Sequence, residues 1–419
     1  MSPFYSPLRI RFITLLLSGT VLYFFANIQR VAIPGAVFDR LQQLYNCPAA
    51  GVANLGAAFM YAYAAMQPLT GLFLDRFGSS RMLIAGGFVF AAGELWFARS
   101  TTLSAACCAQ VLAGIGAGTL YLTLVRENMR VFREKYNITL SAIILLGYAG
   151  GVTANAPSLY LINALGLRAA LTLSAVCVTV FWIICVLLIL PGKLQAERKH
   201  HTFSPREFLP VLQASHNVKL YVFGALNFGL FYVLQTVIGK KFLQDFCSMP
   251  DMKAGWIFSA TGAIAASGGF LFALLGQLTG GKRRIFCRIA GVSSLTVFGT
   301  VFILILADVR NGMIYGGLLL FLSATASLST VLIPMLKESN PSTLIGKSIS
   351  LLNFTFYLTV AILGNLTGSL LNCFTPQIRD GVSIYGRETW ITISALLLIA
   401  SGFVFYYSFQ MRETRKEKI

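Results

Sequence analysis

The chain of 419 residues is strongly apolar and strongly basic. Hydrophobic residues make up 56% of it, charged residues make up 11%, and the net charge is +18. This composition lies outside the range of soluble globular domains, so water is excluded as the main solvent of the chain. A charge of +18 would fit nucleic-acid binding, but no nucleic-acid module is present. Basic residues facing anionic lipid at one membrane surface explain the charge.

Apolar segments recur along the whole chain, and each is long enough to cross ~30 Å of hydrocarbon, which needs about 20 helical residues. Backbone groups inside the bilayer have no water to bond, so the chain must span it as helices or as a closed barrel. The segments lack the period-2 alternation of barrel strands, which leaves a helical bundle. The sequence predicts an all-α integral membrane protein with twelve transmembrane helices in two six-helix halves. The expected spans are residues 11–37, 51–74, 82–98, 102–125, 138–165, 168–191, 218–242, 252–279, 286–307, 311–336, 343–374 and 389–410.

The longest polar interval, from Lys193 to Lys219, separates six spans from six. We expect an N-terminal half over 1–192, a cytoplasmic linker over 193–217, a C-terminal half over 218–411 and a basic cytoplasmic tail over 412–419. The first span is too long for a signal peptide and lacks a small-residue cleavage site, so it is expected to be retained.

The distribution of basic residues predicts the orientation. With the N-terminus inside, most of the 33 Lys and Arg residues fall in cytoplasmic connections. Because Lys and Arg favour that side, both termini are expected in the cytoplasm.

Cysteines, metals and cofactors give little signal. Cys47, Cys247 and Cys373 are expected near the outer face and could pair in an oxidising compartment, but the sequence does not choose a pairing. No CxxC or His cluster indicates a metal, and no cofactor is expected.

No nucleophile with a base and no phosphate loop appears, so an enzyme is not expected.

Residues 71–81 (GLFLDRFGSSR) carry the first specific motif, between the second and third spans. They resemble the signature loop of the major facilitator superfamily, and the twelve-span layout resembles that family over the whole chain. Glycine permits close helix approach, and the acidic residue can face a helix N-terminus or a basic partner. The resemblance implies a loop that latches the two halves on the cytoplasmic side. Its residues here are Gly71, Asp75, Arg76, Gly78 and Arg81.

Other segments depart from the family's motifs. Residues 276–284 (GQLTGGKRR) resemble the same loop without its acidic residue, so a latch there is doubtful. Residues 110–118 (QVLAGIGAG) are similar to a second motif, but Gln110 stands where that motif has the arginine associated with proton coupling. Span five has Gly147 and Gly151 but lacks the glycine-proline pattern of drug antiporters, which disfavours a drug exporter.

Residues 24–31 (FFANIQRV) and 61–68 (YAYAAMQP) resemble a bacterial group of nutrient and metabolite carriers within this superfamily. That group is similar to lysosomal dipeptide carriers. The resemblance implies alternating access, a bacterial inner-membrane location and a small-molecule substrate. We expect a monomer in the lipid bilayer.

Arg30 is the residue that the physics of the membrane singles out. A cation deep in a span costs about 2.5–3.5 kcal/mol and usually faces the bundle interior. Tyr23, Asn27 and Arg30 share one helix face, which lines the central cavity in this superfamily. Arg30 is therefore expected to hold a carboxylate, phosphate or sulfonate; the alternative is a structural pair or a snorkelling residue.

Further polar residues at membrane depth are candidates for substrate contacts. Gln235 lies in span seven, the pseudo-repeat of span one, and is either a ligand or an interhelical hydrogen bond. The remaining candidates, each with packing as its alternative, are Tyr63, Gln67, Tyr121, Asn353 and Tyr357.

Glu94 is the acidic residue clearly inside a span and the candidate for coupling. Burial would raise the pKa of a carboxyl there and let it carry a proton. The alternative is a structural role, with Arg99 as its partner.

These observations predict a secondary transporter that moves a small carboxylate-bearing solute, such as an amino acid, short peptide or organic acid. Uptake is favoured, and proton coupling is left open. The alternatives are an exporter of metabolites or drugs and a non-transporting receptor with the same fold.

Overall fold

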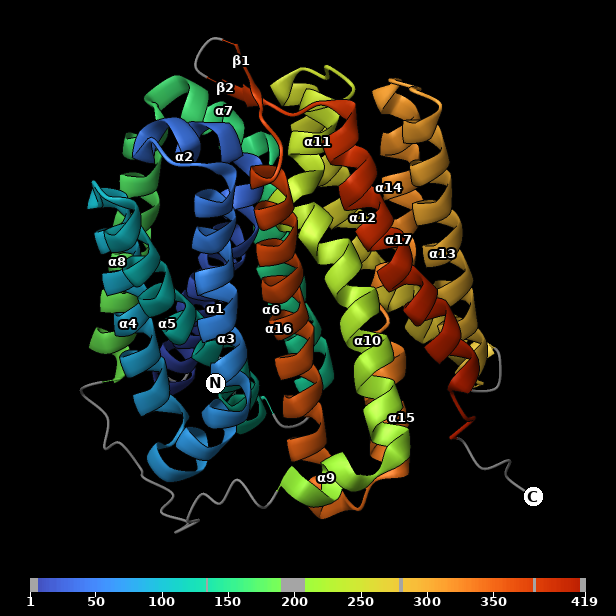
Figure 1. Cartoon of the computed structure of the whole chain (residues 1–419). Helices are drawn as coiled ribbons and strands as arrows, with labels where there is room; N and C mark the ends of the chain where they lie inside the picture. The colour runs from blue at the N-terminus through green and yellow to red at the C-terminus, as the bar shows by residue number, and fades with distance from the viewer. Residues whose placement is uncertain (1–6, 133–134, 190–207, 279–281, 380–381, 415–419) are drawn as a thin grey trace. The chain divides into compact units, whose positions relative to one another are not determined.

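The computed structural model describes residues 7–132, 135–189, 208–278, 282–379 and 382–414. Nearly all of these residues are helical, and one short hairpin is the exception (Figure 1). The predicted linker over 193–217 lies mostly outside the described residues, as does the end of the basic tail.

Among the described residues, eleven helices are long and apolar enough to cross a membrane, and the pair Ile138–Thr153 with Ala156–Leu165, bent by 53°, makes twelve if it is counted as one span. This layout confirms the expected class of all-α membrane protein. Exposed apolar side chains such as Leu173, Val180 and Leu187 lie on α8 (Leu167–Ile189), as expected where a helix faces lipid.

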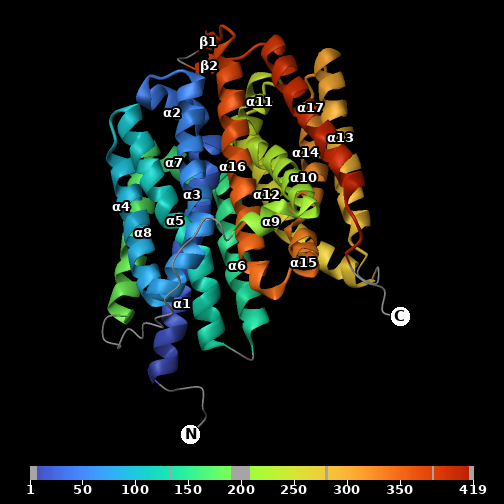
Figure 2. The ribbon, with the colours of Figure 1, turned by 60° about the horizontal axis from the view of Figure 1, so that its bottom comes forward.

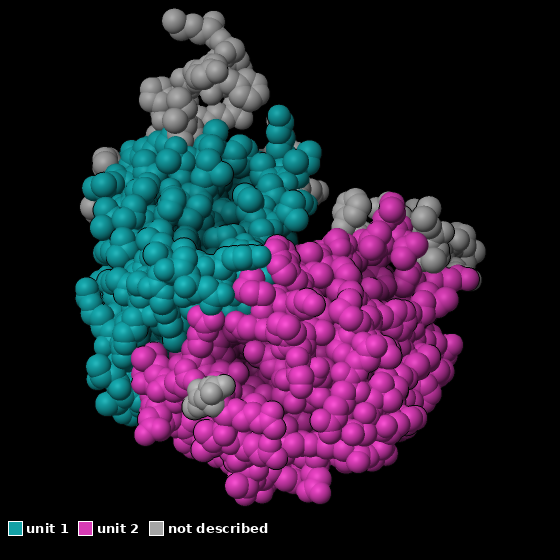
Figure 3. Space-filling model, turned by 90° about the horizontal axis from the view of Figure 1, so that it is seen from above, with its two compact units in different colours: residues 1–30, 58–203 teal, residues 31–57, 204–419 magenta. Residues whose placement is uncertain are grey.

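The chain forms two compact units, coloured in Figure 3. Unit 1 comprises residues 1–30 and 58–203, and unit 2 comprises residues 31–57 and 204–419. The end of the first span and the start of the second thus belong to unit 2, and the later division, between residues 203 and 204, falls within the linker expected at 193–217.

Small residues form close packing contacts between the helices of unit 1. These helices are α1 (Pro7–Val31), α3 (Ala49–Phe77, whose first residues belong to unit 2), α4 (Ser79–Arg99), α5 (Leu103–Val131), α6 (Tyr136–Thr153), α7 (Ala156–Leu165) and α8 (Leu167–Ile189). A Cβ at Gly93 would clash with the Ala113 backbone and one at Gly116 with the Phe90 backbone. Glycine therefore lets α4 and α5 approach at backbone distance, which strengthens van der Waals packing in lipid.

Unit 2 holds the other spans. Its elements are η1 (Ala32–Ala36), α2 (Phe38–Tyr45), α9 (Leu209–Gln213), α10 (Ser215–Val233), η3 (Leu234–Ile238), α11 (Gly239–Asp245), α12 (Asp251–Leu278), α13 (Arg284–Leu306), α14 (Gly312–Ala326), α15 (Ser329–Ser339), η4 (Ser342–Leu344), α16 (Ile345–Asn372), β1 (Gln377–Arg379), β2 (Val382–Ile384) and α17 (Arg387–Gln410). Helices α10 and α16 lie side by side (Figures 1 and 2), with Gly229 against Thr359. Strands β1 and β2 pair antiparallel in the connection before α17.

Unit 2 contains two distorted helical segments, η1 and η3, and η1 is kinked at Ile33, whose φ of −108° and ψ of 111° are not helical. Segment η1 continues α1, and η3 continues α10. They pack on each other, because Gly35 leaves room for the Thr236 backbone, which a Cβ would meet at 2.8 Å. Wide helical turns of this kind are frequent at functional sites.

Candidate functional site

The polar face of α1 in unit 1 is buried and internally bonded. Asn27 Nδ2 donates to the Tyr23 carbonyl at 2.8 Å, and Arg30 donates to Asn27 Oδ1. Arg30 is only 2% exposed. The i, i+3 spacing on α1 therefore lets Asn27 orient the Arg30 guanidinium, shortly before the segment η1 begins.

Helix α3 supplies a second wall. The Arg30 guanidinium lies 5.4 Å from the centre of the Tyr63 ring, a cation–π distance, and Tyr63 stacks on Phe59. Gln67 Nε2 donates to the carbonyls of Tyr63 and Gly118 at 3.4 and 3.5 Å. Arg30 thus contacts an amide oxygen and an aromatic face, while Gln67 contributes to packing of α3 on α5.

Helices α5 and α6 complete the arrangement. The rings of Tyr23 and Tyr121 lie 5.6 Å apart. A Cβ at Gly147 would fall inside the Tyr23 ring, and one at Gly150 would clash with the Phe24 carbonyl, so both glycines let α6 approach α1. Unit 1 therefore brings together the predicted residues of α1, α3 and α5 in one region: Tyr23, Asn27, Arg30, Tyr63, Gln67 and Tyr121. We call this set the Arg30 region.

Gln235 in unit 2 has its side-chain amide occupied. Its Nε2 donates to the Phe258 carbonyl at 3.0 Å, and its Oε1 accepts from Thr261 Oγ1 at 2.7 Å. Both bonds join η3 to α12. This geometry favours the interhelical hydrogen bond that was the alternative to a ligand role.

Asn353 and Tyr357 lie on α16, half-buried. Tyr357 meets the Phe228 ring edge-on at 5.5 Å, and Phe228 stacks on Tyr232 and Phe356 at 4.6 and 4.8 Å. Sequence reasoning missed this aromatic cluster, because Phe and Tyr at helical spacing are common in any bundle.

The motif loop between α3 and α4 is ordered by charge and by one glycine. Asp75 Oδ1 accepts from Arg126 Nη1 at 2.7 Å, which is the basic partner expected as one possibility. Gly78 has φ +77° and ψ 159°, a conformation essentially restricted to glycine, so it makes the turn possible. Arg76 and Arg81 are exposed.

Among the described residues, a Cβ at Gly71 would meet no atom within 4 Å. The close helix approach expected at Gly71 stays a prediction.

Glu127, which the sequence analysis did not single out, anchors the same loop. It is fully buried, accepts from Ser79 and Ser80 hydroxyls at 2.8 Å each, and pairs with Arg130 at 2.9 Å. The serines directly follow Gly78, so the carboxylate fixes the start of α4.

Glu94 is buried in α4, 2% exposed, and its Oε1 has no hydrogen-bond partner in the described part of the chain. The pair with Arg99 that was one alternative is not formed there. Gln110 on α5 also has both amide atoms without partners among these residues. Two buried polar groups on packed helices therefore remain unsatisfied, which is costly in a membrane interior.

A buried ionic cluster in unit 2 contains Lys240 and Lys241. Lys241, 0% exposed, pairs with Asp39 at 2.6 Å and Asp245 at 2.9 Å. Lys240 pairs with Asp251 and donates to the Ala36 carbonyl at 2.5 Å. The cluster ties α2 and η1 to α11 and α12.

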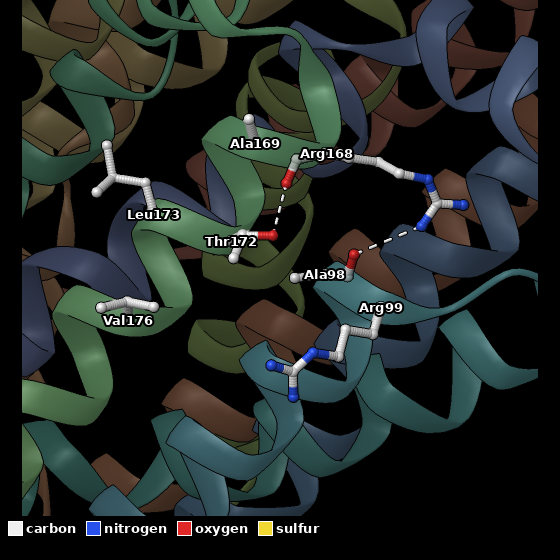
Figure 4. Close-up of a pocket in the computed structure, with 7 residues that line it drawn as sticks. All are labelled: Ala98, Arg99, Arg168, Ala169, Thr172, Leu173 and Val176. Atoms are coloured by element: carbon white, nitrogen blue, oxygen red, sulfur yellow. Dashed lines mark hydrogen bonds between the residues drawn. The ribbon is translucent and has the colours of Figure 1, made fainter.

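A cavity of about 610 Å³ lies outside the Arg30 region, between α4 and α8 of unit 1, and is lined by Arg99, Arg168, Thr172 and apolar residues (Figure 4). Arg168 points back to the carbonyls of Ala98 and Ser100 and is therefore used in packing. This shallow hollow has no feature that selects a solute.

The eight cysteines are all free thiols. No disulfide therefore joins Cys47, Cys247 or Cys373 in this structure.

Together, the spans and the small-residue packing define a polytopic helical membrane protein. A family model, the Major Facilitator Superfamily, matches residues 15–365, and the chain belongs to that superfamily. It is therefore a multi-pass membrane transporter and not an enzyme. No protein with a curated description matches the chain.

Solved structures support the same fold. The nucleoside transporter NupG is 15% identical, with a TM-score of 0.70, and the match covers 95% of this chain and 100% of that one. A bacterial homologue of the human lysosomal transporter Spinster is 14% identical, with a TM-score of 0.71, covering 99% and 100%. A mutant of the peptide transporter POT in complex with alafosfalin is 13% identical, with a TM-score of 0.72, covering 96% and 94%. At these identities the likeness shows the fold alone.

Proposed function

We propose that the chain is a secondary transporter that carries a small organic anion, bearing a carboxylate, by alternating access. The observation that carries this proposal is the buried Arg30 guanidinium, held by Asn27 and Tyr63 inside a membrane span. A cation kept at this depth is costly unless it serves a function or a partner. An arginine binds a carboxylate in a bidentate manner, so Arg30 is the proposed contact for the carboxylate of the cargo.

The proposed cargo is an amino acid, a short peptide or an organic acid. Aromatic side chains of the Arg30 region, Tyr23, Tyr63 and Tyr121, would pack against its organic part. Asn353 and Tyr357 are proposed as further contacts from α16. The structural neighbours include a peptide transporter and a nucleoside transporter, so the fold accommodates cargo of this size.

We place the protein in a bacterial inner membrane with both termini in the cytoplasm, since the basic residues favour that orientation. The loop containing Asp75 and Arg76 would then latch the cytoplasmic side. Uptake is preferred to export. Glu94 is the proposed group for proton coupling, because it is a buried carboxyl without a hydrogen bond at Oε1.

The test is thermal stabilisation of the purified protein by amino acids, dipeptides, carboxylates and phosphate esters. A ligand at 100 times its Kd stabilises the folded state by about 2.7 kcal/mol. We expect a carboxylate to raise the Tm of the wild type, to lose this effect in Arg30→Ala and to bind more weakly in Arg30→Lys, which keeps the charge without the fork. Arg168→Ala, whose arginine lies in the hollow of Figure 4, is the control. An unchanged Tm shift in Arg30→Ala would assign Arg30 a structural role.

A further inference from the structure

A second cavity, of about 450 Å³, lies at one end of unit 2. It is formed by the connections that follow α11, α13 and α16, together with the start of α17. Because spans alternate in direction, these three connections lie at the same end of the unit, where Figure 1 shows α11 and the β1–β2 hairpin. Its volume is in the range of pockets that bind small molecules.

Three arginines line this cavity, one from each connection or its following helix: Arg310, Arg379 and Arg387. Arg310 donates to both oxygens of the neighbouring Asp308 at 3.0 and 3.3 Å and lies 5.7 Å from the centre of the Phe246 ring, whereas Arg379 reaches Gln377 at 3.5 Å. Arg387 has a structural role, because it donates to the carbonyls of Ile305 and Leu306.

The negative charge around the cavity is smaller than the positive charge. Asp245 pairs with Lys241 at 2.9 Å and also accepts the Tyr385 backbone N–H at 3.0 Å, but Lys241 is shared with Asp39 at 2.6 Å. Asp308 adds a further carboxylate beside the cavity. Tyr385 stays a neutral phenol, because burial, and then the charge of Asp245, raise its pKa to about 12. The three arginines and Lys241 together therefore exceed these three carboxylates by one positive charge.

We propose that this cavity, defined here as the Arg310–Arg379 cavity, binds a free multivalent anion carrying carboxylate or phosphate groups. Guanidinium forks pair with either group in a bidentate manner, and two of them facing one cavity favour a dianion or trianion. The polar lining includes Gln244 and Gln377, which add neutral donors. A lipid headgroup offers the same phosphate chemistry, but the walls come from connections between spans, so a dissolved anion is the occupant that we propose.

This inference does not depend on the proposed function, because the cavity lies within unit 2 and contains no residue of the Arg30 region. The probe is citrate, titrated into the purified full chain in a neutral detergent at low ionic strength. We expect the citrate Kd to rise at least tenfold in the double variant Arg310→Gln/Arg379→Gln. The charge-matched control Arg99→Gln/Lys253→Gln, with both residues exposed elsewhere, is expected to stay within twofold of the wild type. Added salt should weaken binding, since the cavity is open to solvent ions.

Five outcomes decide the proposal. No citrate binding by the wild type, or an unchanged Kd in the double variant, would overturn it. Binding that is lost in Arg30→Ala but kept in the double variant would also overturn it, while supporting the proposed function. Citrate displaced by phosphatidylglycerol in nanodiscs, but not by phosphatidylcholine alone, would assign the cavity to lipid instead. Binding that persists in Arg30→Ala and falls in the double variant supports the proposal.

Discussion

At the scale of single residues, the Arg30 region depends on glycine as much as on polar groups. Arg30, Asn27 and Tyr23 are placed by helical spacing on α1, but the ring of Tyr23 has its position only because α6 presents Gly147 there. Packing in lipid gains most where small residues let backbones approach. The contact of Gly147 with Tyr23 therefore both packs α6 on α1 and positions a side chain of the candidate site.

Gly147→Ala is expected to destabilise the protein by about 1–3 kcal/mol, because the new Cβ would overlap Tyr23 and force the ring to move. The same change at Gly402, where a Cβ would meet nothing within 4 Å, is expected to be neutral or slightly stabilising, as alanine favours the helix. Thermal unfolding of both variants in detergent measures the difference. Equal Tm values for Gly147→Ala and Gly402→Ala would contradict the packing described.

At the scale of elements, the ionic cluster around Lys241 holds α2 against α11 and the hairpin. Lys241 is enclosed by Asp39, Asp245 and the carbonyl of Ser383. Buried charges of this kind are tolerated because each has partners, and removal of one leaves the others uncompensated.

Lys241→Met is expected to cost about 3–5 kcal/mol of stability, since two carboxylates lose their buried cation. Addition of Asp245→Asn should recover part of this loss by removing one of the two charges. Lys253→Met, at an exposed position on α12, serves as the control and should change the Tm little. If Lys241→Met unfolded at the wild-type temperature, the cluster would contribute nothing to stability.

The sequence predicted the spans well because apolar length alone sets them: residues 82–98 were expected and α4 spans Ser79–Arg99. The Arg30 region was also predictable, since it follows from helical spacing on α1 and α3. The contact between η1 and η3 was not predictable, because it depends on the approach of Gly35 to Thr236, far apart in sequence. The burial of Lys240 and Lys241 was not predictable either, because their partners, Asp251 and Asp39, come from other elements.

At the scale of the whole molecule, the account rests on the major facilitator fold and on an orientation that follows from the basic residues. Connections after α11, α13 and α16 should face the outside, together with the Arg310–Arg379 cavity. The exposed Cys373, which follows α16, reports on this side of the membrane.

In intact cells, a membrane-impermeant maleimide is expected to label Cys373 without permeabilisation, because that connection is outside in the proposed orientation. The labelled peptide is identified by mass spectrometry, and Cys373→Ser is the control that removes the signal. Labelling of Cys373 only after the membrane is opened would reverse the orientation.

The most direct test of the central claim is flux in proteoliposomes. The anion found by thermal stabilisation would be supplied outside, and its uptake measured for the wild type, Arg30→Lys and Arg30→Ala. We predict saturable uptake by the wild type, a KM at least tenfold higher in Arg30→Lys and no uptake in Arg30→Ala. Uptake that is unchanged in Arg30→Ala, or binding without any flux in the wild type, would contradict a transporter that acts through Arg30.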